Sequence, residues 1–102
     1  MVTIALPGAY GKPRPALVIQ TDLFEAHSSV TILPVTSTLR AAPLFRIPIR
    51  PTKKNGLRRE SQIMVDKAQT VPREKVGSPF GRIADESMLA VDRALAVFLG
   101  IA

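Results

Sequence analysis

Gly11-Lys12-Pro13-Arg14-Pro15-Ala16-Leu17-Val18-Ile19-Gln20 is the most informative stretch of this sequence, because it joins a buried strand to an arginine on stiff backbone. The run from Ala16 to Gln20 predicts the strand. Each proline fixes its own φ, and Pro15 also disfavours helical backbone at Arg14. A guanidinium held in this way suits a phosphate, since its planar fork of donors matches the oxygens. The alternative is that the prolines simply begin a strand and that Arg14 is an ordinary surface charge.

Several other short segments alternate between apolar and polar residues, and prolines and glycines separate them. We expect further strands over residues 2–6, 30–35, 45–50, 61–65, 68–71 and 80–83. Pro48 predicts that its strand is interrupted or lies at an edge. Asn55-Gly56, in the basic turn that follows, predicts a hairpin. The 9 prolines and 6 glycines among 102 residues likewise favour a β-rich fold.

The pattern changes to a helical period near the C-terminus. Apolar residues recur there at steps of three and four, at Met88, Val91, Ala94, Leu95, Phe98 and Leu99. Asp85 is expected as the N-cap and Gly100 as the stop. We therefore predict a mainly β fold with a C-terminal helix: a small, strongly bent antiparallel barrel forming a single domain over residues 1–102.

Composition excludes several kinds of site. The chain has no cysteine, so disulfides, thiolate metal sites and cysteine nucleophiles are absent. The single histidine, His27, lies in a polar stretch and is expected in a solvated loop, which argues against a histidine zinc site or a serine-histidine-aspartate triad. No carboxylate cluster predicts a divalent metal, and no apolar run approaches the roughly 20 residues of a membrane span. We expect a cytoplasmic protein.

The positive charge is concentrated in the first half of the chain. Residues 1–59 hold nine Lys/Arg against two acidic residues (+7), and residues 60–102 hold five against six (−1), for a net charge of +6. Such asymmetry indicates a polyanionic partner, either nucleic acid or an acidic protein segment. Aromatic residues are few, which argues against a platform for stacking bases.

The ends of two predicted strands indicate where a phosphate-binding site could lie. If the strands at 16–20 and 30–35 are antiparallel neighbours, Arg14 before one and Thr36 and Ser37 after the other share a rim. An arginine beside a hydroxyl can bind phosphate, and it can stabilise the phosphorane formed when RNA is cleaved by its own 2′-hydroxyl. The alternative is that the two hydroxyls merely end a strand. Asp66 must face solvent or a cation. It is either a hydrogen-bond acceptor or proton carrier for substrate, or a solvated residue paired with Lys67 or an arginine.

Three blocks of the sequence together resemble the MazF/PemK ribonuclease toxins of toxin–antitoxin modules: residues 11–19, 33–37 and 61–67. The resemblance extends from about Ile4 to Ile101. It implies an SH3-like barrel that forms a homodimer and binds single-stranded RNA and an acidic antitoxin. It also implies cleavage, without a metal ion or other cofactor, to a 2′,3′-cyclic phosphate and a 5′-hydroxyl.

The resemblance also implies roles for particular residues. The catalytic arginine and threonine of the family fall on Arg14 and Thr36, and the aspartate of the PemK-like branch falls on Asp66. The chain departs from that branch at Met64, where an arginine is usual. The loop over 7–12 corresponds to the segment that helps to select the RNA sequence. The residues expected to contact substrate are Tyr10, Lys12, Ser37, Gln62 and Gln69.

Two other functions remain open on the sequence. One is a non-catalytic toxin of the same fold, like the topoisomerase poison CcdB, which relies on an aromatic tail. This chain ends Phe98-Leu99-Gly100-Ile101-Ala102 and contains no tryptophan. The other is a barrel that binds RNA without cleaving it.

Overall fold

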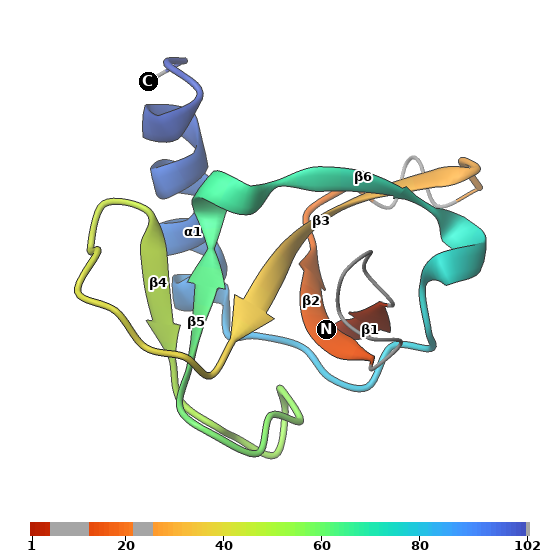
Figure 1. Cartoon of the computed structure of the whole chain (residues 1–102), viewed down its shortest axis with the longest axis horizontal. Helices are drawn as coiled ribbons and strands as arrows, with labels where there is room; N and C mark the ends of the chain where they lie inside the picture. Colours follow the sequence, from red (N-terminus) through yellow and green to blue (C-terminus); the bar gives the residue numbers. More distant parts are fainter. Residues whose placement is uncertain (5–12, 22–25, 102) are drawn as a thin grey trace.

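The computed structural model describes residues 1–4, 13–21 and 26–101 and shows a bent antiparallel sheet with one helix beside it (Figure 1). The strands are β1 (Val2–Ile4), β2 (Arg14–Val18), β3 (Ser29–Thr36), β4 (Arg46–Ile49), β5 (Ser61–Met64) and β6 (Gln69–Pro72). Two short 3-10 helices follow β5 and β6, namely η2 (Val65–Lys67) and η3 (Arg73–Lys75), and α1 (Asp85–Phe98) is the C-terminal helix. The predicted β fold with a C-terminal helix is confirmed.

The strand order is β1-β2-β3-β5-β4, and β6 also pairs with β3. All pairings are antiparallel, and β1 and β4 do not pair with each other in the described part of the chain, so the sheet is bent but not closed. Because β4 has only one neighbour among the described strands, Pro48 lies in an edge strand, as predicted.

A change of register along β3 bends the sheet. Near its end, β3 pairs with β5 in the register Thr36↔Gln62, and near its start it pairs with β6 in the register Ile32↔Gln69. A straight continuation of the β5 register would place residue 66 opposite residue 32, so the three residues of η2 are added to one edge only. Like a β-bulge, the added turn bends the strand that contains it. In Figure 1, β5 and β6 accordingly run in different directions on either side of η2.

Alternate residues of β3 belong to two separate apolar clusters. Leu33 and Val35 pack in a cluster with the apolar side of α1, whereas Val30 and Ile32 pack on the opposite face with residues of β1 and β2. This separation follows from the two-residue period of a strand. The helix therefore covers one face of the sheet, and the even-numbered residues of β3 belong to the other.

Helix α1 differs from the prediction at its start. Ala84, not Asp85, occupies the N-cap position and makes no side-chain cap; its carbonyl accepts a hydrogen bond from Met88 N at 3.0 Å. Asp85 is instead in the first turn, where a carboxylate complements the helix dipole. Gly100 ends the helix as predicted, with φ +74°. Phe98 is 51% exposed, so the predicted apolar face continues beyond the part of α1 that packs on the sheet.

Residues 80–83, predicted as a strand, form no strand. Single hydrogen bonds hold them instead: Phe80 N donates to Met1 O at 3.0 Å and Arg82 N donates to Lys54 O at 2.7 Å. The Met1 ammonium donates to Gly81 O at 2.7 Å, and burial lowers its pKa. This segment thus connects the N-terminus to the loop between β4 and β5. Within the described ranges, no helix is long and apolar enough to cross a membrane.

Candidate active site

A broad groove of about 1120 Å³ lies at the end of β3. It is lined by the start of β2 (residues 13–15), by residues 34–38 at the end of β3, and by residues 56–59 of the loop between β4 and β5. The remaining lining residues are Thr3, Ser61, Met64 and Phe80. The even-numbered β3 residues Pro34 and Thr36 belong to the face opposite α1, so the groove and the helix lie on different sides of the sheet.

The groove brings together Arg14, Thr36 and Ser37, as the sequence predicts. Strands β2 and β3 pair in the register Ala16↔Pro34, and continuing it by two residues places Arg14 opposite Thr36. The Arg14 side chain is exposed, and its guanidinium makes no hydrogen bond or ion pair with the described residues. Thr36 Oγ1 accepts a hydrogen bond from Thr38 N at 3.0 Å, which leaves its own hydroxyl proton available to a ligand.

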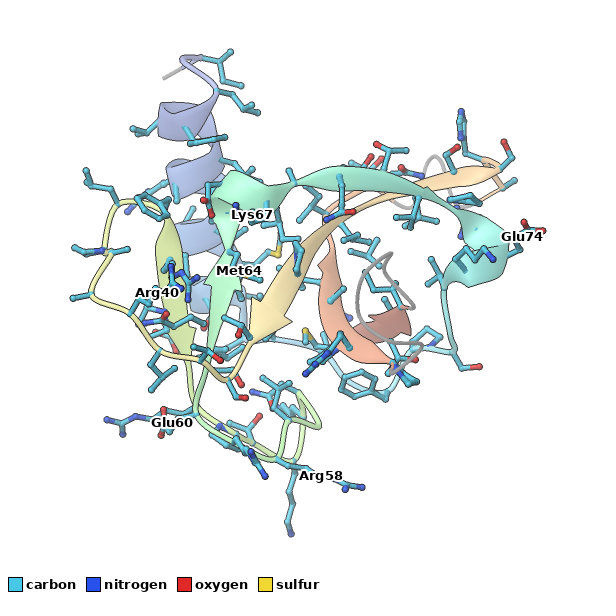
Figure 2. All side chains as sticks on the ribbon, in the orientation of Figure 1. Arg40, Arg58, Glu60, Met64, Lys67 and Glu74 are labelled. Carbon is cyan, nitrogen blue, oxygen red and sulfur yellow. The ribbon has the colours of Figure 1, made fainter. Side chains whose placement is uncertain are left out.

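A basic loop, residues 51–59, contributes its residues 56–59 to another wall of the groove. Arg58 and Arg59 line it, and like Arg14 they form no side-chain hydrogen bond or ion pair among the residues described. Figure 2 shows Arg58 projecting from the end of this loop. Three guanidinium groups therefore border one cavity with no acidic partner in the described ranges, an arrangement that favours a polyanionic ligand.

Asn55 holds the basic loop in shape. It is only 3% exposed, its Oδ1 accepts hydrogen bonds from Thr52 N at 3.0 Å and Leu57 N at 2.9 Å, and its Nδ2 donates to Arg50 O at 2.8 Å. Gly56 follows with φ +71° and packs under the Phe80 ring. The predicted Asn55-Gly56 turn is confirmed, in a longer connection than a two-residue hairpin.

Gln62 lies directly beside the groove, paired with Thr36 across the two strands. Its amide is already occupied: Oε1 accepts from Arg40 N and from Arg46 Nη1, both at 3.1 Å, and Nε2 donates to Arg40 O at 2.8 Å. The predicted contact of Gln62 with substrate stays a prediction, and the structure gives this residue a role in holding the loop over residues 37–45.

Asp66 and Gln69 are not among the residues that line the groove. Asp66 lies in η2, and its Oδ1 is buried with no hydrogen-bond partner in the described part of the chain. The expectation that this carboxylate faces solvent or a cation is therefore wrong for that oxygen, because η2 takes Asp66 out of the strand. Gln69 is exposed and pairs with Ile32, toward the other end of β3. Tyr10 and Lys12 lie outside the described residues.

Residues 1–99 match the family described as PemK-like, MazF-like toxin of type II toxin-antitoxin system. The chain belongs to this family. It is 52% identical over 101 residues to a probable endoribonuclease MazF of Mycolicibacterium smegmatis, covering 98% of this chain and 93% of that protein. The Mycobacterium tuberculosis toxin MazF-mt6 has a similar structure, with a TM-score of 0.82 and 25% identity over 99% of this chain and 97% of that one.

A mycobacterial endoribonuclease solved in complex with its cognate antitoxin has the same fold, with a TM-score of 0.81 and 22% identity over 99% of this chain and 92% of that one. At the position where the sequence departs from the PemK-like branch, this MazF-like chain has Met64, and Arg46 reaches its sulfur at 3.6 Å from the neighbouring strand. A guanidinium from β4 thus lies beside the side chain at position 64.

Sequence reasoning missed three arginines at or beside the groove, namely Arg46, Arg58 and Arg59. The charge asymmetry of the sequence includes them, since all three belong to the basic first half of the chain. It does not single them out, because their positions depend on the fold of a long loop and on the pairing of β4 with β5. Within the described ranges, no group of three or more His, Cys, Asp or Glu side chains is placed to hold a metal ion.

The packing of Gly56 predicts a difference between two glycines of similar backbone conformation. A Cβ on Gly56 would lie 2.7 Å from the Phe80 ring, whereas a Cβ on Gly100, with φ +74°, would have nothing within 4 Å. Gly100→Ala should lower the free energy of unfolding by about 1 kcal/mol, the cost of left-handed backbone. Gly56→Ala should lower the free energy of unfolding by the same amount and by about 1–3 kcal/mol more, because the new methyl group collides with the Phe80 ring. Urea unfolding measures both; equal losses would show that Phe80 does not restrict the loop.

Proposed function

We propose that this MazF-like protein is a cytoplasmic toxin that cleaves single-stranded RNA without a metal ion, leaving a 2′,3′-cyclic phosphate and a 5′-hydroxyl. The observation that carries the proposal is the placement of Arg14 opposite Thr36 in a groove bordered by two further arginines that have no partner among the described residues. The family supports it, since a relative 52% identical to this chain is named a probable endoribonuclease.

In the proposed reaction, the 2′-oxygen bonds to phosphorus, the bond from phosphorus to the 5′-oxygen breaks, and the proton lost from the 2′-hydroxyl is balanced by one gained at the 5′-oxygen. Negative charge builds up on the non-bridging oxygens of the phosphorane. Arg14 would stabilise that charge, because a guanidinium stays protonated and donates two parallel hydrogen bonds. The Thr36 hydroxyl would donate a further hydrogen bond to the same phosphate.

The reaction also needs groups that carry the two protons. Arg14 is a poor base because the pKa of an arginine lies far above neutrality. We propose Asp66 as one proton carrier; it does not line the groove that holds Arg14 and Thr36, so its part in the reaction needs a direct test. An Asp66→Asn variant that cleaves at the wild-type rate would remove Asp66 from the mechanism.

The role of Arg14 is tested by cleavage of a long single-stranded RNA in EDTA. Wild type should cut at a short recurrent sequence, and the ends should be a cyclic phosphate and a 5′-hydroxyl. Arg14→Ala should lower kcat by about 100-fold or more, the usual loss when an oxyanion-stabilising donor is removed. If Arg14→Ala reduces RNA affinity but not kcat, Arg14 only binds phosphate; if folded wild type does not cut at all, the protein binds RNA without cleaving it.

Arg58 and Arg59 are proposed as further phosphate contacts. Each contact to single-stranded nucleic acid contributes roughly 0.7 to the slope of log affinity against log salt. Arg58→Ala and Arg59→Ala should each reduce that slope by about this amount on a 2′-O-methyl RNA, which cannot be cleaved. Arg93→Ala, which removes the same charge from an exposed position on α1, is the control and should not change the slope. An unchanged slope for all three would exclude contacts from the basic loop.

We also propose that an acidic antitoxin inhibits the protein by covering this groove. The support is the excess of positive charge over residues 1–59 and the antitoxin complex of the structurally similar endoribonuclease. Antitoxin should then compete with RNA for binding, and a ternary complex of toxin, antitoxin and RNA would contradict the proposal.

A homodimer is the proposed assembly. Exposed apolar residues at the end of α1 support an apolar interface: Val97 is 64% exposed, Leu99 59% and Ile101 78%. Figure 1 shows this end of the helix extending past the sheet. Sedimentation equilibrium should give twice the chain mass for wild type and a shift toward monomer for Leu99→Asp. Leu44→Asp, at a loop residue 78% exposed, should leave the dimer intact. A monomeric wild type at micromolar concentration would overturn the dimer.

A further inference from the structure

The loop over residues 37–45 joins the end of β3 to β4, and two side chains, Arg46 and Gln62, bind its residues 38–40 from β4 and β5. Arg46 Nη1 donates to Thr38 O at 2.9 Å and to Gln62 Oε1 at 3.1 Å. Gln62 in turn binds both backbone groups of Arg40, accepting from N at 3.1 Å and donating to O at 2.8 Å. Among the described residues, every hydrogen bond that joins the backbone of residues 38–40 to β4 or β5 is made by one of these two side chains. The backbone of Thr38 also donates to Thr36 Oγ1 of β3. Figure 2 shows Arg40 beside β4 and β5.

The register places one of these side chains opposite Thr36 and the other opposite a residue that lines the groove. Gln62 is the cross-strand partner of Thr36, and Arg46 is the cross-strand partner of Met64, which lines the groove. Paired residues in an antiparallel sheet point to the same face. Arg46 and Gln62 are therefore on the groove side of the sheet, opposite α1, and both are half-buried.

The Thr36 hydroxyl depends on the loop that these side chains hold. Its Oγ1 accepts a hydrogen bond from Thr38 N at 3.0 Å, and the carbonyl of Thr38 is bound by Arg46. If residues 38–40 move, the acceptor geometry at Thr36 Oγ1 changes, and with it the direction in which the hydroxyl can donate. The fixed fork of a guanidinium suits this task, because it binds two acceptors at once in one plane.

We propose that Arg46 and Gln62 form a positioning clamp that fixes residues 38–40 and so aims the Thr36 hydroxyl into the groove for the transition state. The clamp residues act through Thr36 and need not touch the RNA. This inference rests on the proposed ribonuclease function. It adds two residues to the site whose effect should appear in kcat, because misplacing a catalytic group by about 1 Å can cost on the order of 100-fold in rate.

The test uses full-length protein and one RNA substrate. Arg46→Met and Gln62→Leu remove the polar groups with little change in volume, and Arg46→Lys keeps the charge but not the fork. Arg50→Met is the matched control: it removes the same charge just beyond the end of the same strand, from a side chain 89% exposed. Hydrogen exchange of the amides at residues 38–42 reports on the loop independently of activity.

The clamp predicts a drop in kcat of at least tenfold for Arg46→Met and Gln62→Leu, with KM changed less than threefold and with faster exchange in the loop. The double variant should be no slower than the slower single variant, because the two side chains act as one unit. Arg46→Lys should recover little of kcat, and Arg50→Met should keep the wild-type kcat. Thermal melts confirm that each variant is folded.

Three outcomes would overturn the inference. Wild-type kcat together with faster loop exchange would show that holding the loop is irrelevant to catalysis. Full recovery in Arg46→Lys would show that charge, and not geometry, is what Arg46 contributes. Unchanged exchange at residues 38–42 in both single variants would show that no clamp exists, and this measurement decides the point even if wild type does not cut RNA and the proposed function itself fails.

Discussion

The hydrogen bonding of β3 on both of its edges is the constraint on which the rest of the structure depends. One edge pairs with β2, and the other pairs first with β6 and then with β5. Ile32 and Leu33, adjacent in this strand, are fully buried in different clusters. Since β3 supplies residues to both faces, the register that buries these side chains also determines where Thr36 emerges.

The groove is a consequence of that register. Beyond Pro34 the even-numbered side of β3 carries no apolar side chain, so the apolar cluster on that face ends and an open space begins. Arg14 borders this space because β2 starts there. Arg58 and Arg59 border it because the basic loop is hydrogen-bonded to Arg82 N through Lys54 O and packs against Phe80 at Gly56. Two segments far apart in the sequence thus bring positive charge to one hydroxyl.

Sequence reasoning was right where local pattern decides the structure and failed where distant contacts decide it. Alternation and proline spacing located most of the strands, and the expected pairing of two of them correctly placed Arg14 beside Thr36. Asp66, however, follows an apolar run typical of a continuing strand, yet the chain turns into η2 there. Gln62 has the kind of polar side chain that could contact substrate, but its amide is hydrogen-bonded to the loop backbone at Arg40. Arg46 joins the site through the pairing of β4 with β5, and the Asn55-Gly56 turn predicts that these strands pair but not the register that places Arg46 opposite Met64.

The division of β3 between two faces limits how the chain length can vary. Leu33 and Thr36 are separated by an odd number of positions, so one belongs to the helix side and the other to the groove. Deleting or inserting a single residue between them would reverse this parity, turning the hydroxyl toward α1 and an apolar side chain toward the groove. A change of two residues would keep the parity and only move the hydroxyl along the strand. Evolution can therefore alter the length of this part of β3 only in steps of two without losing the groove hydroxyl.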